Sequence, residues 1–62
     1  MQKRKNIAKI SGYNLIQVDV QGDNGRVIRT SYEVLEPTEE SIGRFGSLKE
    51  AQSFIKLLCH LN

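Results

Sequence analysis

Apolar residues in the last quarter of the chain recur with the spacing of a helix. Placed at about 100° per residue, seven apolar side chains fall on one broad face: Leu48, Ala51, Phe54, Ile55, Leu58, Cys59 and Leu61. Ser47 and Glu50 have the spacing of a capping box, in which the serine accepts from first-turn amides and the glutamate reaches back. The pattern predicts an amphipathic helix that begins after Ser47 and covers a sheet.

The end of this segment carries the only cysteine and the only histidine of the chain. Cys59 falls within the apolar face and is predicted to be a buried, unreactive thiol. His60 points about a quarter-turn away, toward solvent, so the two do not form a catalytic pair. Leu57 lies at the boundary of the polar face and is predicted to be exposed.

Two runs upstream alternate between apolar and polar residues as strands do, over residues 13–21 and 26–36. A three-residue loop of Asp23, Asn24 and a left-handed Gly25 is predicted between them, because a two-residue turn would mix core with surface positions. This loop sets three cross-strand pairs on one face: Val20 with Ile28, Val18 with Thr30 and Ile16 with Tyr32. On the reverse face, the same register pairs Asp19 with Arg29.

A turn at residues 37–40 leads to a third, short strand over residues 41–45. Pairing around this turn sets Tyr32 opposite Phe45 and Glu33 opposite Arg44. The predicted fold is therefore α+β, a three-stranded antiparallel meander (β-β-β-α) packed on one C-terminal amphipathic helix. The pattern leaves undecided whether the N-terminal segment adds a further strand. The helix is predicted to cover one face of the meander: Ile16, Val18, Val20, Ile28, Tyr32, Val34 and Phe45.

An apolar cluster is predicted on the reverse face, where a solvated sheet normally carries polar side chains. It consists of Tyr13, Leu15, Leu35 and Ile42. Either the N-terminal segment covers it, with Ile7 and Ile10 as a lid or a fourth strand, or a partner binds there. The cluster and Leu57 are the candidate partner-binding residues, and open edge strands offer backbone groups for β-augmentation.

Basic residues are concentrated at the start of the chain. The positive charges of Lys3, Arg4, Lys5 and Lys9 sum to more than the formal net charge of the whole chain, +2. We therefore predict a basic, partly flexible arm over residues 1–9, followed by a single domain over residues 10–62. Such arms contact nucleic acid in some DNA-binding folds. The candidate nucleic-acid-binding residues are these four side chains and two predicted sheet arginines, Arg29 and Arg44.

The strand-to-helix passage from Ile42 to Ala51, IGRFGSLKEA, combines a phenylalanine, a small residue and a helix cap. In this passage, and in its order of three strands followed by a helix, the chain resembles plant AP2 domains and the arm-binding domains of tyrosine integrases. The resemblance implies that the sheet face away from the helix lies in the DNA major groove, with Arg29 and Arg44 available to contact it. The sheet face of those families is rich in arginine and tryptophan, whereas this chain has no tryptophan.

The inventory of side chains argues against catalysis. A chain of 62 residues supports one domain, and a single cysteine and a single histidine allow neither an internal disulfide nor a zinc set. We therefore expect no enzyme activity, no cofactor, no metal and no small-molecule substrate. No apolar run reaches the ~20 residues of a membrane span, and the basic start is not followed by the core of a signal peptide, so a cytoplasmic location is expected.

Two functions follow from these patterns. The first is a protein-binding module that acts through the sheet face, an edge strand or a homodimer, such as the small adaptors or enzyme inhibitors that phages and mobile elements encode. The second is a nucleic-acid-binding protein that uses the basic arm and the sheet arginines.

Overall fold

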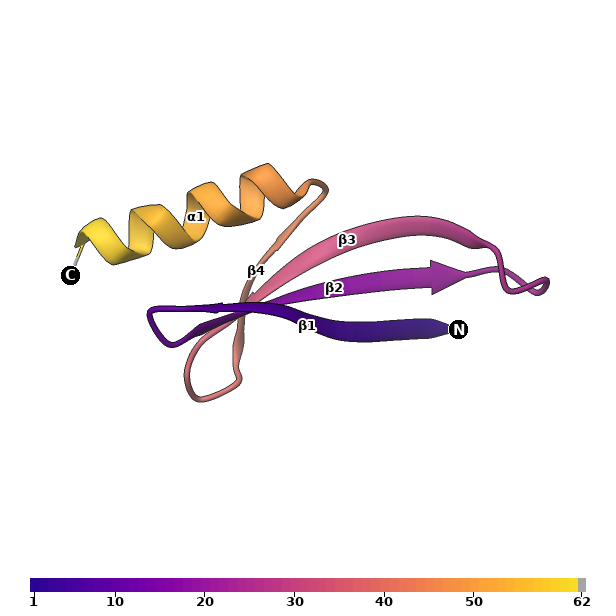
Figure 1. Ribbon diagram of the computed structural model, residues 1–62, viewed down its shortest axis with the longest axis horizontal. Coiled ribbons are helices and arrows are strands. Elements are labelled where there is room, and N and C mark those ends of the chain that lie inside the picture. Colours follow the sequence, from indigo (N-terminus) through magenta and orange to yellow (C-terminus); the bar gives the residue numbers. More distant parts are fainter. Residues whose placement is uncertain (62) are drawn as a thin grey trace.

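The computed structural model describes residues 1–61 and shows one antiparallel sheet covered on one face by a single helix (Figure 1). The strands follow one another in the order β1-β2-β3-β4. Their bounds are β1 Gln2–Ile10, β2 Tyr13–Gln21, β3 Val27–Leu35 and β4 Ser41–Phe45, and the helix α1 spans Leu48–Leu61. The predicted α+β meander is confirmed, and the N-terminal strand that was left open is present.

Residues 2–9, which belong to the predicted arm, form β1 together with Ile10 at one edge of the sheet. The strand pairs with β2 along its whole length, and the Met1 carbonyl accepts from Gln21 N at 2.8 Å. The turn between the two strands, Ser11-Gly12, has φ of 52° and 88°, as a type I′ hairpin turn requires. A tight turn of this kind holds the basic segment in the sheet.

Each of the three hairpins contains a bulge at which an isoleucine is the extra residue. These residues are Ile7, Ile28 and Ile42. A bulge shifts the pairing register by one position, and because side chains alternate, it moves every later residue of one strand to the other face relative to its partner strand.

The bulge at Ile28 corrects the predicted pairing of β2 with β3. The loop itself is as predicted, since Gly22 N donates to Arg26 O at 2.8 Å and Gly25 has φ of 78°. Beyond Ile28 the pairs differ from the prediction: Val20 lies opposite Arg29, Val18 opposite Ser31 and Ile16 opposite Glu33. The sequence pattern predicted an unbroken ladder, and the single extra residue makes this register wrong by one.

The hairpin between β3 and β4 keeps its predicted register because its loop and bulge compensate each other. Glu36 N donates to Glu40 O at 2.9 Å around a three-residue loop in which Glu39 has φ of 70°. Ile42 then adds one residue, so Tyr32 lies opposite Phe45 and Glu33 opposite Arg44, as predicted.

The core lies between the sheet and α1. Leu15, Val34, Ala51 and Ile55 are each at most 1% exposed, and Tyr13 packs against them. The rings of Phe45 and Phe54 extend this core, with centroids 5.0 Å apart. Leu15 and Tyr13 were predicted on the reverse face, and the shifted register places them under the helix. Ile16 and Val18, predicted under the helix, are buried on the reverse face.

The helix begins as predicted, with Ser47 Oγ accepting from Glu50 N at 3.2 Å. Its C-terminal end extends past the turn between β1 and β2 (Figure 1). Cys59, predicted to be buried, is exposed for this reason, and Leu61 is 82% exposed. His60 and Leu57 are exposed, in agreement with the prediction.

The opposite end of the sheet extends beyond the N-terminal end of α1 (Figure 1). There β1, β2 and β3 form a three-stranded ribbon, because β4 ends opposite Tyr32 and leaves residues 27–31 of β3 without a neighbouring strand on that side. The molecule is accordingly elongated, with extents of 44 × 21 × 15 Å.

Candidate functional site

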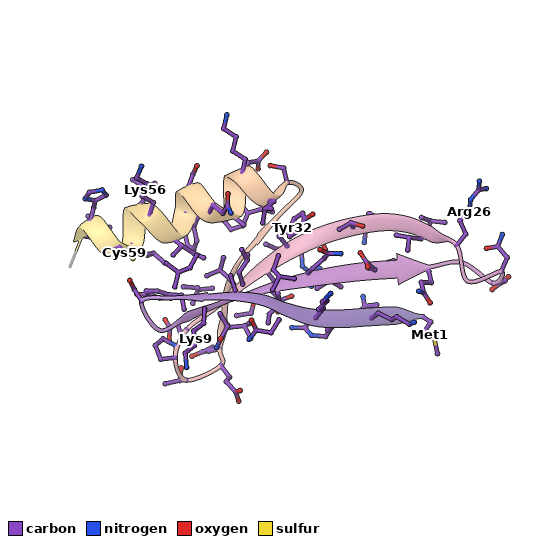
Figure 2. All side chains as sticks on the ribbon, viewed as in Figure 1. Met1, Lys9, Arg26, Tyr32, Lys56 and Cys59 are labelled. Atoms are coloured by element: carbon purple, nitrogen blue, oxygen red, sulfur yellow. The ribbon has the colours of Figure 1, made fainter. Side chains whose placement is uncertain are left out.

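The sheet face turned away from α1 carries most of the basic side chains of the strands. The register places Arg4 beside Val18, Arg29 beside Val20 and Arg44 beside Glu33, all on this face. Lys9 shares it through its pairing with Asn14, and Figure 2 shows its side chain on the side of the sheet opposite the helix. We call the face defined by Arg4, Lys9, Arg29 and Arg44 the basic face.

The basic face has an excess of positive charge. Among the strand positions that the structure describes, Glu33 is its only carboxylate, so four cations and one anion give a formal charge of +3. Lys3 and Lys5, opposite Asp19 and Gln17, lie on the other side of the sheet. The six predicted nucleic-acid-binding residues are therefore divided, with four on the basic face and two on the helix side.

Glu33 connects two of the arginines. Its Oε1 lies 2.9 Å from Arg4 Nη2, and its Oε2 lies 3.2 Å from Arg44 Nη2. The Arg44 pair was predicted, whereas the Arg4 pair was not. The residue is only 5% exposed, and hydrogen bonding to Arg4, followed by Arg44, lowers the pKa of the Glu33 carboxyl against the opposing effect of burial. The same hydrogen bond raises the pKa of Arg4.

The pair of Arg4 and Glu33 also explains the burial of two aliphatic residues on this face. Arg4 lies beside Val18 and Glu33 beside Ile16, so the bridge between them passes over β2. Val18 is 2% and Ile16 is 7% exposed. The hydrocarbon stem of an arginine covers apolar surface while its guanidinium stays accessible, and here 45% of the Arg4 side chain remains exposed.

Arg29 differs from the other two arginines because it makes no ion pair within residues 1–61. Its predicted partner Asp19 lies opposite Thr30 instead, on the helix side, and accepts from Thr30 Oγ1 at 2.8 Å and from Gln17 Nε2 at 3.3 Å. Arg29 and Arg44 line a common hollow at the open edge of β3, together with Ser31 and Gly46. Two arginines, one of them without an ion pair among the described residues, therefore border the same hollow.

The predicted partner-binding residues do not form one exposed cluster. Leu15 is in the core, Tyr13 and Ile42 pack against it, and Leu35 is half-buried. Leu57 alone is largely exposed, at 62%, and it lies on the helix rather than on the sheet face. The predicted face of Leu15 and Tyr13 is wrong, because the bulge at Ile28 places Leu15 in the core and Tyr13 against it.

Cys59 borders a hollow with Ser11, Tyr13 and Pro37, in which no base accompanies the thiol. Among residues 1–61, no group of three histidine, cysteine or carboxylate side chains could hold a metal ion. No helix in this part of the chain is long and apolar enough to cross a membrane.

Comparison of the chain with protein-family models, curated proteins and solved structures found no match. Sequence reasoning identified Arg29, Arg44, Arg4 and Lys9 as candidates but did not place them on one face. The missed signal was the isoleucine at each bulge, which breaks the strand alternation at residues 7, 28 and 42.

Proposed function

We propose that this chain binds double-stranded DNA by laying its basic face in the major groove, without catalysing a reaction. The observation that supports the proposal is the placement of Arg4, Lys9, Arg29 and Arg44 on the one sheet face that the helix leaves open. A major groove about 12 Å wide admits a β-ribbon, and arginine contacts both phosphates and guanine edges.

The polar residues between the basic ones suit the same surface. Gln2, Asn6 and Ser31 share this face, and these side chains donate to phosphates or base edges in protein–DNA interfaces. Asn6 Nδ2 already donates to Asn14 Oδ1 at 3.1 Å, which orients one amide of the pair. The face therefore combines positive charge with hydrogen-bonding groups that neutral protein partners do not require.

The test is the affinity for a random-sequence DNA duplex of about two turns, measured by fluorescence anisotropy between about 50 and 200 mM salt. Four phosphate contacts per copy predict a slope of log affinity against log salt of roughly −3 to −4. The double variant Lys9→Gln/Arg29→Gln removes two basic side chains for which no ion pair is present in the described chain. We expect it to lower the slope magnitude by about 2 and the affinity at least tenfold.

Lys3→Gln/Lys5→Gln is the matched control because it removes the same charge from β1 on the helix side of the sheet. We expect it to retain most of the affinity. Equal losses of DNA affinity in the two double variants would show that only net charge or a basic N-terminal arm matters. That result would contradict DNA binding through the basic face. An RNA duplex, whose deep major groove excludes a sheet, is expected to bind less tightly.

A protein-binding role is the second candidate function. It is supported by the open edge of β4 and the exposed Leu57 beside it, rather than by the apolar sheet cluster that the sequence predicted.

A further inference from the structure

An open groove runs along α1 on the side of the free strand β4. It is lined by Phe45, Lys49, Glu50, Ser53, Phe54 and Leu57. The rings of Phe45 and Phe54 in this lining lie 5.0 Å apart, and Leu57, which lines the same groove, has 62% of its surface exposed. A leucine this exposed next to two aromatic rings gains free energy when another surface covers it.

The strand next to this groove has an unpaired backbone edge. β4 is the last strand of the sheet order, so within residues 1–61 no strand pairs with its outer side. Its bulge is at Ile42, which leaves Gly43, Arg44 and Phe45 in regular pairing with β3. Unpaired backbone groups of an edge strand accept an added strand from another chain.

We propose that a second copy of this chain occupies the groove, with the two β4 strands paired antiparallel and each Leu57 inserted into the groove of the other copy. The groove favours its own copy because it carries one cation and one anion, Lys49 and Glu50. In a two-fold interface the same patch meets itself, so a patch with both charges allows Lys49 of one copy to pair with Glu50 of the other, whereas a single-sign patch would repel itself.

The symmetry of this pairing has a structural consequence. Antiparallel pairing of two identical edge strands places the two-fold axis perpendicular to the sheet, so both helices lie on one side and both basic faces on the other. The continuous sheet then carries eight basic-face side chains instead of four. Proteins with strongly salt-dependent DNA affinity make about six to ten phosphate contacts, a number that one copy does not reach and two copies do.

The inference goes beyond the proposed function, and its test contains no nucleic acid. Sedimentation equilibrium of the full chain from about 10 to about 500 μM is expected to show a monomer–dimer equilibrium in the micromolar range, as for a small interface. Leu57→Asp is expected to weaken dimerisation at least tenfold, because the charge would be buried at the centre of the interface.

Ile28→Asp is the matched control, since it introduces the same charge at an aliphatic residue of similar exposure, 66% against 62%, on β3 and away from β4. The control is expected to remain dimeric. Far-UV circular dichroism verifies that both variants fold, and Leu57→Ser replaces Leu57→Asp if the latter does not.

Hydrogen exchange provides a second readout of the same interface. In the wild type, the amides of residues 43–45 that point outward from β4 are expected to exchange more slowly as concentration rises, and in Leu57→Asp they are not. A wild-type monomer at the highest concentration, a Leu57→Asp dimer, or equal weakening by Ile28→Asp would each overturn the inference. None of these outcomes bears on DNA binding by the basic face, which the lysine and arginine variants test separately.

Discussion

The guanidinium of Arg4 reaches across β2 to the carboxylate of Glu33, with 2.9 Å between Nη2 and Oε1. The contact joins β1 to β3, two strands that are not neighbours in the sheet, and covers the aliphatic side chains of β2 between them. The carboxylate neutralises part of the positive charge of the basic face, and the ion pair helps to hold β1 and β3 in the same sheet.

The first prediction concerns pH. Because the pKa of Glu33 is lowered in the folded chain, its ion pairs contribute their full stability above the ordinary carboxyl pKa of 4.5, and this contribution is lost as pH falls through the lower, folded value. We expect the free energy of unfolding in urea to decrease by roughly 1 kcal/mol from this residue between about pH 5 and about pH 2, because the arginine partners are largely exposed. Glu33→Gln is expected to show a correspondingly flatter pH profile, and an unchanged profile would contradict the assignment.

The second prediction concerns DNA affinity. Glu33→Gln removes the only carboxylate among the basic-face strand positions and releases Arg4 and Arg44. At neutral pH we expect the affinity for a DNA duplex to rise several-fold and the salt slope to steepen by about 1. Asp19→Asn is the matched control, because it removes a carboxylate from the helix side of β2. A rise with Asp19→Asn as large as with Glu33→Gln would mean that net charge alone sets the affinity.

The third prediction concerns the packing of β4 against α1. A methyl group at Gly43 would lie 2.9 Å from Phe45 Cε2, closer than side chains tolerate, and 3.2 Å from Phe54 Cε2, so both rings would have to shift. Gly43→Ala is therefore expected to lower the free energy of unfolding by about 1–3 kcal/mol, as overpacked cores do. Gly46→Ala is the control, since nothing lies within 4 Å of its added methyl group and its φ is not left-handed. Chemical denaturation of the two variants, compared with the wild type, measures the difference.

The fourth prediction concerns the loop between β3 and β4. Glu39 has φ of 70°, a conformation that costs a residue with a side chain about 1–2 kcal/mol and glycine nothing. Glu39→Gly is expected to stabilise the chain by roughly 0.5–1 kcal/mol after the added flexibility of the unfolded state is subtracted. Thr38→Gly, in the same loop without a positive φ, is expected to destabilise it slightly. Thermal unfolding midpoints of both variants distinguish these opposite signs.

Several elements of this fold could be predicted from local sequence alone. The helix start at Ser47 and the left-handed Gly25 depend on neighbouring residues, and the structure confirms both of them. The residue types that carry charge on the sheet were also identified from sequence.

The assignment of side chains to faces could not be predicted in the same way. Ile28 directly follows Val27, and either of these two aliphatic residues can continue the alternating pattern, so the sequence fits an unbroken ladder as well as a bulged one. The bulge at Ile28 is favoured because it brings Leu15 and Val34 together under Ile55, which is a gain from packing between distant segments. The sequence likewise predicts an arm for the basic N-terminal residues. Their backbone finds its hydrogen-bonding partner in β2, and this pairing is a tertiary contact that the local pattern does not show.

Caps, turns and alternation are local properties of the chain, and they are enough to predict β2, β3, β4 and α1, their order and the charged residues available for function. Contacts between distant segments bring Arg4, Lys9, Arg29 and Arg44 to one face and place Leu15 beneath the helix, and local sequence does not show these contacts. One extra residue in a strand costs little locally but reverses which side chains face the core, so the packing of the whole sheet against α1 selects between the two arrangements.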